Sequence, residues 1–117
     1  MLPNFVPQSI YWLVEGDEFI GRISLRHELN DQLRRLGGHI GYEIRPSRRR
    51  QGYGTAILGL VLPKAREHGL TSVLITCDAD NIASQRIIEQ HGGMPDDPYV
   101  PPDGSVPALR YWIELGD

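Results

Sequence analysis

The stretch from Arg45 to Thr55 constrains the fold most, because it joins a strand pattern to a helical pattern through two glycines, Gly52 and Gly54. Before it, residues 39–44 alternate in polarity, and Pro46 favours an extended residue ahead of it, which predicts the end of a strand. After it, apolar residues recur at helical spacing: Ile57, Leu60, Val61 and Ala65. The glycines therefore fall at the turn from strand to helix.

A turn of this kind is a candidate anion site. The first N–H groups of a helix have no partners within the helix, and the helix dipole adds positive charge there. Gly52 and Gly54 let this backbone approach a ligand without intervening Cβ atoms. Four arginines crowd the entry to the turn in a chain of net charge -3: Arg45, Arg48, Arg49 and Arg50. This local charge indicates an anionic ligand such as phosphate; the alternative is a solvated, arginine-rich turn that binds nothing.

Two familiar glycine-rich loops are excluded by spacing. The dinucleotide-binding fingerprint needs a third glycine three residues after the second, where this chain has Ile57. The phosphate-binding P-loop needs Gly-Lys-Ser or Gly-Lys-Thr, and the chain contains neither. What remains is Arg49-x-x-Gly52-x-Gly54 between a strand and a helix, which resembles the coenzyme A loop of the GCN5-related N-acetyltransferases (GNAT).

The composition is that of one globular domain over residues 1–117, with 40% hydrophobic residues. No apolar run approaches the roughly 18 residues that span a membrane, and no secretory leader starts the chain, so we expect a soluble, cytoplasmic protein. The single cysteine, Cys77, predicts no internal disulfide, and the four histidines show no metal spacing with it. A sequence pI of about 5.8 argues against nucleic acid as a partner.

The N-terminal half predicts three strands and one helical turn. Two runs rich in β-branched and aromatic residues are joined by Gly16-Asp17-Glu18 as a β-hairpin: Ser9–Glu15 and Phe19–Arg26. Residues 27–38 are polar and predict a loop with a short helical turn, capped by Asn30 or Asp31. The third strand then covers His39–Arg45.

The C-terminal half begins with a helix over Gly54–His68, which Gly69 ends. The apolar run Val73–Cys77 predicts a strand at the sheet centre, because both of its faces must be covered. A second helix over Ile82–His91 should direct Ile87 and Ile88 toward the sheet.

The last part of the chain predicts a proline-rich loop over Met94–Pro107 and a closing strand over Ala108–Leu115, whose side chains alternate in polarity. The resulting order is strand, strand, strand, helix, strand, helix, strand, which is a mixed α/β (α+β) sheet. This order matches the GNAT fold from its second strand to its end.

A second element strengthens the resemblance. After the central strand, Asn81-x-x-Ser84 resembles the family's helix-opening Asn-x-x-Ala or Asn-x-x-Ser, and Arg86 and Gly92-Gly93 follow at the family's spacing. The chain is therefore identified as a member of the GNAT family that is N-terminally truncated, since relatives normally begin with a further strand and two helices that form the wall on the acceptor side.

The resemblance implies acetyl-CoA as the cofactor and assigns residues to it. The backbone of the loop would hold the pyrophosphate, with charge added by Arg49 and Arg50: Gln51, Gly52, Tyr53, Gly54 and Thr55. The strand ending at Ile44 and Arg45 would pair its backbone with the pantetheine arm. Asn81, Ser84 and Arg86 would line the other side of the cofactor, although a helix cap explains Asn81 equally well.

The family's chemistry is direct attack of an acceptor amine on the acetyl thioester. A backbone N–H near Ile44 would serve as the oxyanion donor. Where many relatives have a carboxylate at the start of the third strand and a tyrosine acid on the second helix, this chain has Gly38-His39 and Ile88. Glu43 is the nearest carboxylate on that strand and is the candidate base, acting through a water, while a surface glutamate is the alternative.

Two functions remain open. The first is an N-acetyltransferase acting on a primary amine of a small molecule or peptide. The second is a non-catalytic module that binds acyl-CoA or another protein. In either case the hairpin at Ser9–Arg26 would expose a sheet edge, which favours a homodimer.

Overall fold

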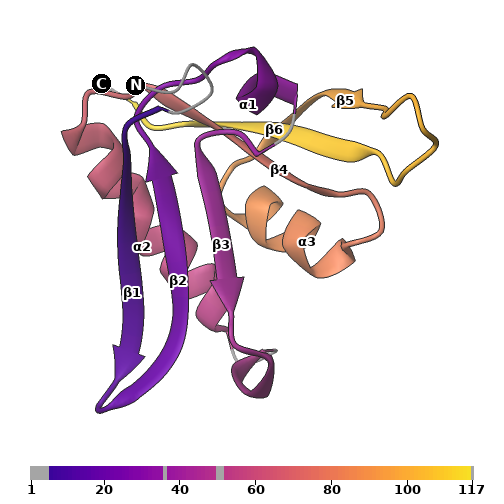
Figure 1. Ribbon diagram of the computed structural model, residues 1–117. Coiled ribbons are helices and arrows are strands. Elements are labelled where there is room, and N and C mark those ends of the chain that lie inside the picture. Colours follow the sequence, from indigo (N-terminus) through magenta and orange to yellow (C-terminus); the bar gives the residue numbers. More distant parts are fainter. Residues whose placement is uncertain (1–5, 36, 50–51, 117) are drawn as a thin grey trace.

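The computed structural model of the protein describes residues 6–35, 37–49 and 52–116. The strands span Gln8–Glu15 (β1), Glu18–Arg26 (β2), Ile40–Ile44 (β3), Ser72–Asp78 (β4), Met94–Tyr99 (β5) and Ala108–Glu114 (β6). The helices span Asp31–Arg35 (α1), Tyr53–Glu67 (α2) and Ile82–Gln90 (α3), and a short 3₁₀ turn covers Pro46–Arg48. The strands form one six-stranded sheet in the order β1-β2-β3-β4-β6-β5 (Figure 1).

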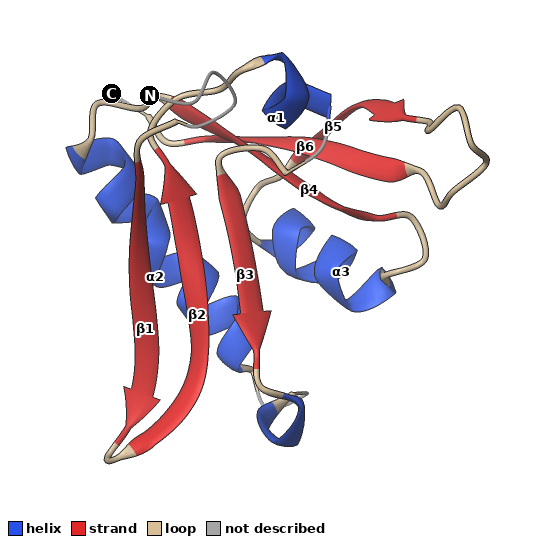
Figure 2. Cartoon of the chain, viewed as in Figure 1, coloured by secondary structure: helices blue, strands red, loops and turns tan. Residues whose placement is uncertain are grey.

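One face of the sheet, which we call the helix face, is covered by α2 and α3. Figure 2 shows α2 crossing behind β1, β2 and β3, with α3 lying beside β4. The buried residues of these strands and helices form one core, in which the main members are Ile23, Leu25, Ile40, Ile57, Leu58, Val61, Val73, Ile75, Ile88, Tyr111 and Ile113. The alternation of apolar side chains along β2, β3 and β6 thus places every second residue against the helices.

The opposite face carries α1, and we call it the α1 face. Arg110 of β6 is paired in register with Thr76 of β4, so both side chains lie on the same face, opposite to buried Tyr111. The Nε of Arg110 donates to the backbone oxygen of Arg34 in α1 over 2.6 Å. This contact places α1 on the face away from α2 and α3.

The predicted elements of the N-terminal half are confirmed. β1 and β2 form an antiparallel hairpin, and Gly16 in its turn has a positive φ of 61°. The side chain of Asn30 accepts a hydrogen bond from the N–H of Leu33 over 2.8 Å, so Asn30 caps α1. β4 lies in the interior of the sheet, as predicted, and Val73, Leu74 and Ile75 are fully buried.

The prediction of a loop over Met94–Pro107 is wrong in its first half. Met94–Tyr99 forms β5, which pairs antiparallel with β6 and has an irregularity between Asp96 and Tyr99. The prolines argued against a strand because they lack an N–H group, but an edge strand needs partners on one side only. Both Pro95 and Pro98 lie on this outer, solvent-exposed strand.

The other edge of the sheet is β1, as expected from the hairpin. Ile10, Trp12 and Val14 point away from the helix face and are exposed to 47%, 64% and 58%. Homodimer formation along this edge stays a prediction. No helix in the described part of the chain is both long and apolar enough to cross a membrane.

The central strand gives the first testable prediction. Ile75 is fully buried in β4, so Ile75→Ala leaves a cavity in the core and should lower the free energy of unfolding by about 2 to 5 kcal/mol. Ile82→Ala, at a position 52% exposed in the first turn of α3, should change it by less than about 0.5 kcal/mol. Urea denaturation of both variants measures the difference, and equal effects would contradict this description of the core.

Candidate active site

A slot opens where β3 and β4 part. The two strands are parallel and share one pair of register partners, Ile40 and Ile75, and then diverge, as Figure 1 shows. The slot has a volume of about 330 Å³. Its lining residues come from both strands, the ends of β2 and α1, and the start of α3: Arg26, Gly37, Ile40, Gly41, Tyr42, Thr76, Cys77, Asp78, Asn81 and Ser84.

The closed end of the slot is held by hydrogen bonds that replace ordinary strand pairing. The N–H of His39 donates to the oxygen of Leu74 over 2.7 Å, and the N–H of Leu74 donates to Nδ1 of His39 over 2.9 Å. The N–H of Gly37 donates to Oγ1 of Thr76 over 3.0 Å. Burial lowers the pKa of His39, and the nearby charge of Arg26 lowers it further, so this imidazole is a neutral structural group.

The slot reaches both faces of the sheet. Ile40 packs in the core on the helix face, and residues two apart in a strand share a face, so Tyr42 lies on that side too. Gly41 and Thr76 belong to the α1 face. A ligand on the helix face and another on the α1 face would therefore meet between the two strands.

After Ile40, which pairs with Ile75 of β4, β3 is paired with β2 alone among the described strands. The N–H of Arg26 donates to the oxygen of His39 and the N–H of Arg45 donates to the oxygen of Ile20, so the odd-numbered residues of this strand face β2. Tyr42 and Ile44 consequently turn their backbone groups toward the slot. The N–H of Arg45, expected to pair with the cofactor, donates to the oxygen of Ile20 in β2 instead, and a role of Arg45 in cofactor binding stays a prediction.

The loop before α2 leaves the helix start uncapped. Gly52 is the N-cap with φ of 84°, and no side chain of the described residues caps the helix. The first helical hydrogen bond runs from the N–H of Ala56 to the oxygen of Gly52, so the N–H groups of Tyr53, Gly54 and Thr55 precede it. This arrangement suits an anion. Arg50 and Gln51, also predicted to bind the cofactor, lie outside the described residues.

The two glycines of this loop differ in what a larger side chain would meet at each position. A Cβ atom on Gly52 would meet nothing within 4 Å, so its positive φ and its open surroundings leave room for a ligand. A Cβ atom on Gly54 would lie 2.9 Å from Cδ1 of Ile87. This atom is the end of a flexible side chain, so Gly54 eases the close approach of α2 and α3, and Ile87 would have to shift for a larger residue.

The positive charge of the loop is lower than the sequence indicated. Arg48 forms an ion pair with Glu18 at the tip of the hairpin, and Nη1 of Arg45 lies 3.4 Å from the same carboxylate. The hydrogen bond from Arg48 is the main reason that the pKa of Glu18 is lowered. Arg49 is exposed and its Nε donates to the oxygen of Ile44 over 3.0 Å. Within the described residues, Arg49 is thus the loop arginine without a carboxylate partner.

The start of α3 forms one wall of the slot. Oδ1 of Asn81 accepts from the N–H of Ser84 over 3.2 Å, so Asn81 is a helix cap that also lines the slot. The hydroxyls of Ser84 and Tyr42 lie 2.8 Å apart and connect this wall to β3. Arg86 is exposed and lies outside the slot lining, so a cofactor role for Arg86 stays a prediction.

Two ionisable side chains in the slot are neutral. Burial raises the pKa of Tyr42, more than the hydrogen bond with Ser84 lowers it. Burial also raises the pKa of the Cys77 thiol to about 11, with smaller contributions from Asp78 and Glu89. Ile88, at the family's tyrosine position, is fully buried in the core and has no access to the slot.

Glu43, the candidate base, lies on β3 but outside the slot lining. It is exposed and its Oε2 lies 3.4 Å from Nε of Arg22, its register partner on β2. Its neighbour Gly41 lines the slot on the same α1 face. A role for Glu43 through a water stays a prediction.

Of the lining residues, the sequence analysis proposed only Asn81 and Ser84 for the site, and those that it missed include Arg26, Tyr42 and Thr76. Tyr42 alternates with Ile40 and Ile44, and this pattern could have placed it on their side of the strand. Arg26 and Thr76 had no such signal, because their positions depend on the register between strands distant in sequence.

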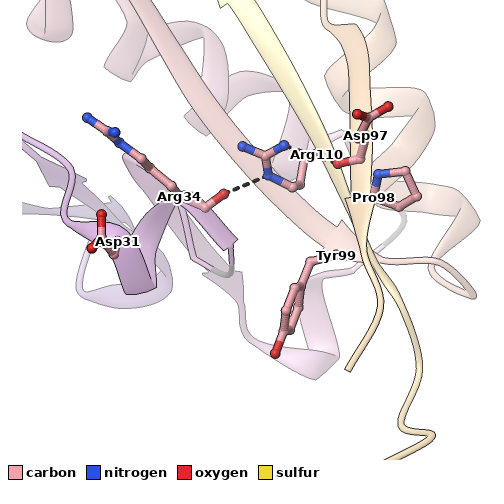
Figure 3. Close-up of a pocket in the computed structure, with 6 residues that line it drawn as sticks. All are labelled: Asp31, Arg34, Asp97, Pro98, Tyr99 and Arg110. Carbon is pink, nitrogen blue, oxygen red and sulfur yellow. Dashed lines mark hydrogen bonds between the residues drawn. The ribbon is translucent and has the colours of Figure 1, made fainter. Parts of the chain in front are cut away.

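A second hollow of about 350 Å³ lies between α1 and the β5-β6 pair, and Figure 3 shows its lining residues, with Arg110 between Arg34 and Asp97. Arg110 is already neutralised, since its Nη1 lies 3.3 Å from Oδ2 of Asp96. It also donates to the backbone oxygens of Arg34 and Asp97. The hollow therefore offers no unpaired charge from Arg110.

These features agree with the comparison with known protein families. The family model of the acetyltransferase (GNAT) domain matches residues 4–94, which is more than half of the chain. The chain belongs to the GNAT acetyltransferase family. No curated protein sequence matches it significantly.

Solved structures with the same fold are acetyltransferases of low sequence identity. The spermidine/spermine N-acetyltransferase SpeG from Vibrio cholerae has a TM-score of 0.74 at 14% identity, with 92% of this chain and 67% of that chain covered. The structure of yncA from Salmonella typhimurium with its cofactor acetyl-CoA has a TM-score of 0.69 at 18% identity, with 88% of this chain and 62% of that chain covered. The ribosomal-protein-S18-alanine N-acetyltransferase from Escherichia coli has a TM-score of 0.70 at 15% identity, with 94% of this chain and 70% of that chain covered. At these identities the likeness establishes the fold.

The slot lining predicts how this GNAT protein reacts with thiol reagents. Because the pKa of Cys77 is raised to about 11, its alkylation by iodoacetamide should still accelerate above pH 9, whereas an unperturbed thiol has a pKa of about 8.5. Acetyl-CoA, which has no free thiol to consume the reagent, should slow the reaction, since Cys77 lines the slot. Mass spectrometry of the modified chain over a pH series measures both effects, with N-acetylcysteine as the control. A half-maximal rate near pH 8.5 would contradict the burial of the thiol.

Proposed function

We propose that the protein is an acetyl-CoA-dependent N-acetyltransferase that acetylates a primary amine. The observation that carries this proposal is the slot between β3 and β4, which joins the two faces of the sheet beside the uncapped start of α2. Family membership supports the activity class, and the structure of yncA with acetyl-CoA supports the cofactor.

The described residues fit coenzyme A. The N–H groups of Tyr53, Gly54 and Thr55 point out of the start of α2 and would bind the pyrophosphate, with the charge of Arg49 beside them. The open space around Gly52 admits the phosphates. The backbone groups of Tyr42 and the N–H of Ile44 would pair with the pantetheine arm, as an added strand would, while the oxygen of Ile44 accepts from Nε of Arg49.

The chemistry requires one bond to form and one to break. Acetyl-CoA supplies an activated acetyl thioester. The nitrogen of the acceptor amine bonds to the acetyl carbon, the carbon–sulfur bond breaks, and the sulfur leaves with a proton. The protein must therefore position an unprotonated amine, remove a proton from its nitrogen and give a proton to the sulfur.

Tyr42 is suited to give that proton. Its hydroxyl is held at the slot by Ser84, over 2.8 Å, and its raised pKa keeps it protonated at neutral pH. Among the described residues, Tyr42 supplies the phenol group that lines the slot, because Ile88 stands where the family has a tyrosine on α3. Proton removal is assigned to Glu43 acting through a water from the α1 face.

The loop can be tested with two matched glycines. Gly52 and Gly69 stand at opposite ends of α2, have φ of 84° and 88°, and have open space where a Cβ would be placed. Gly52→Ala and Gly69→Ala should therefore cost similar backbone strain, about 1 kcal/mol. Only Gly52→Ala should weaken coenzyme A binding, by about 10-fold, because its methyl group crowds the phosphate site. Calorimetric titration with coenzyme A measures this, and equal weakening in both variants would remove the loop from the site.

The acid can be tested by removing one hydroxyl. Tyr42→Phe should lower kcat by about 100-fold while the affinity for coenzyme A stays within about 3-fold, because general acid catalysis contributes on that scale. Tyr11→Phe, on β1 and two strands away from Tyr42 in the same cross-strand row, is the matched control, since Tyr11 also packs against the core but does not line the slot. Thiol release from acetyl-CoA with a panel of primary amines measures the rates. Tight coenzyme A binding without thiol release for any amine would instead favour the non-catalytic binding module.

A further inference from the structure

Arg26 holds an unusual place at the closed end of the slot. It is the last residue of β2, and its Nη1 donates to the backbone oxygens of Gly37 and Gly38 over 3.2 and 3.1 Å. A Cβ atom on Gly41 would lie 3.9 Å from both Nη1 and Nη2. The guanidinium therefore lies directly over the glycine that lines the slot on the α1 face.

The charge of Arg26 has no counterpart among the described residues. Arginines elsewhere around the sheet do pair with carboxylates, Arg22 with Glu43, Arg45 and Arg48 with Glu18, and Arg110 with Asp96, whereas exposed Arg49 bonds to a backbone oxygen. Arg26 instead contacts carbonyl groups, which carry only partial charge, and it is half-buried. Partial burial without a counter-ion lowers the pKa of Arg26.

The other polar groups around Arg26 do not neutralise it. His39 is neutral, because burial lowers its pKa and its Nδ1 accepts a hydrogen bond. Asp78 also lines the slot, but it is exposed at the end of β4 and forms no ion pair with Arg26 among the described residues. A small anion bound at Arg26 would therefore supply a missing charge.

This anion belongs to the acceptor rather than to coenzyme A. The loop that suits phosphates, Gly52 to Thr55, starts α2 on the helix face, whereas Arg26 lies over Gly41 on the α1 face. The two charged sites thus stand on opposite faces of the sheet, with the slot between them. The volume of about 330 Å³ leaves room for only a short acceptor segment next to the strands.

We propose that the acceptor is a small amine with a carboxylate beside its amino group, as in an amino acid, and that Arg26 binds this carboxylate. The proposal rests on the acetyl transfer proposed above. A guanidinium presents paired N–H groups that match the two oxygens of a carboxylate. The same charge disfavours polyamines, which would bring further positive charge to the closed end of the slot.

The test compares pairs of acceptors that differ in this charge, with rates expressed per unprotonated amine, because an amide also lowers the pKa of its α-amino group. Initial rates of thiol release are measured at saturating acetyl-CoA with L-amino acids, the matching L-amino acid amides, and spermidine. For the wild type, kcat/KM should favour the amino acids. Arg26→Gln should lower the ratio of amino acid to amide by about 10- to 100-fold, because a charge-assisted hydrogen bond is lost, and Arg26→Lys should restore part of it. Lys64→Gln, which removes an exposed cation from α2 on the helix face, should leave the ratio unchanged.

A second readout separates this inference from the proposed function. Calorimetry with the coenzyme A-loaded protein measures binding of the same amines without turnover, and denaturation shows whether each variant is folded. Two outcomes would overturn the inference and leave the acetyltransferase activity in place. One is acetyl transfer whose ratio of kcat/KM for amino acid to amide is unchanged by Arg26→Gln, and the other is a preference for spermidine. Amino acid binding that depends on Arg26, without acetyl transfer to any amine, would support the carboxylate site and overturn the activity.

Discussion

The site depends on the failure of two parallel strands to stay paired. β3 and β4 meet at Ile40 and Ile75, and from there the backbone groups of Tyr42 and Ile44 have no strand beside them. Unpaired backbone groups inside a sheet are costly, and a ligand with its own amide groups can satisfy them. The hydrogen bonds between His39 and Leu74 and between Gly37 and Thr76 hold the strands together at one end, which fixes where the parting begins.

The hairpin contributes to the site from a distance. Its tip brings Glu15 and Glu18 to the coenzyme A loop, where Glu18 pairs with Arg48 and Oε2 of Glu15 accepts from the Tyr53 hydroxyl over 2.6 Å. These contacts anchor the loop to the sheet and neutralise part of its charge. The anion site then relies mainly on backbone N–H groups, whose positions are set by the helix, rather than on a cluster of mobile side chains.

The same fold divides charge between its two faces. The start of α2 presents partial positive charge on the helix face, and Arg26 presents a full charge on the α1 face. Between them the slot holds neutral groups, the hydroxyls of Tyr42 and Ser84 and the thiol of Cys77. A reaction in which an amine and a thioester meet between the strands fits this division, since each substrate has its own positively charged binding group and the lining between them is mostly uncharged, with Asp78 exposed at the end of β4.

Local patterns determined most of the elements and the coenzyme A loop. The hairpin, α2, α3 and the central strand follow from periodicity and from Gly, Pro and Asn at helix ends, and the motif from Arg49 to Gly54 is contiguous, so neighbours in sequence suffice to recognise it. β5 was missed because proline in a strand is acceptable only at an edge, and the edge is a property of the whole sheet.

Tertiary structure alone decided which charges are free. The sequence places four arginines together, but the hairpin register brings Glu18 to two of them, and no local pattern could show that pairing. It also leaves Arg26 without a carboxylate and turns Glu43 toward Arg22. Charges act through space over a few ångströms, so their balance depends on contacts between segments far apart in the chain.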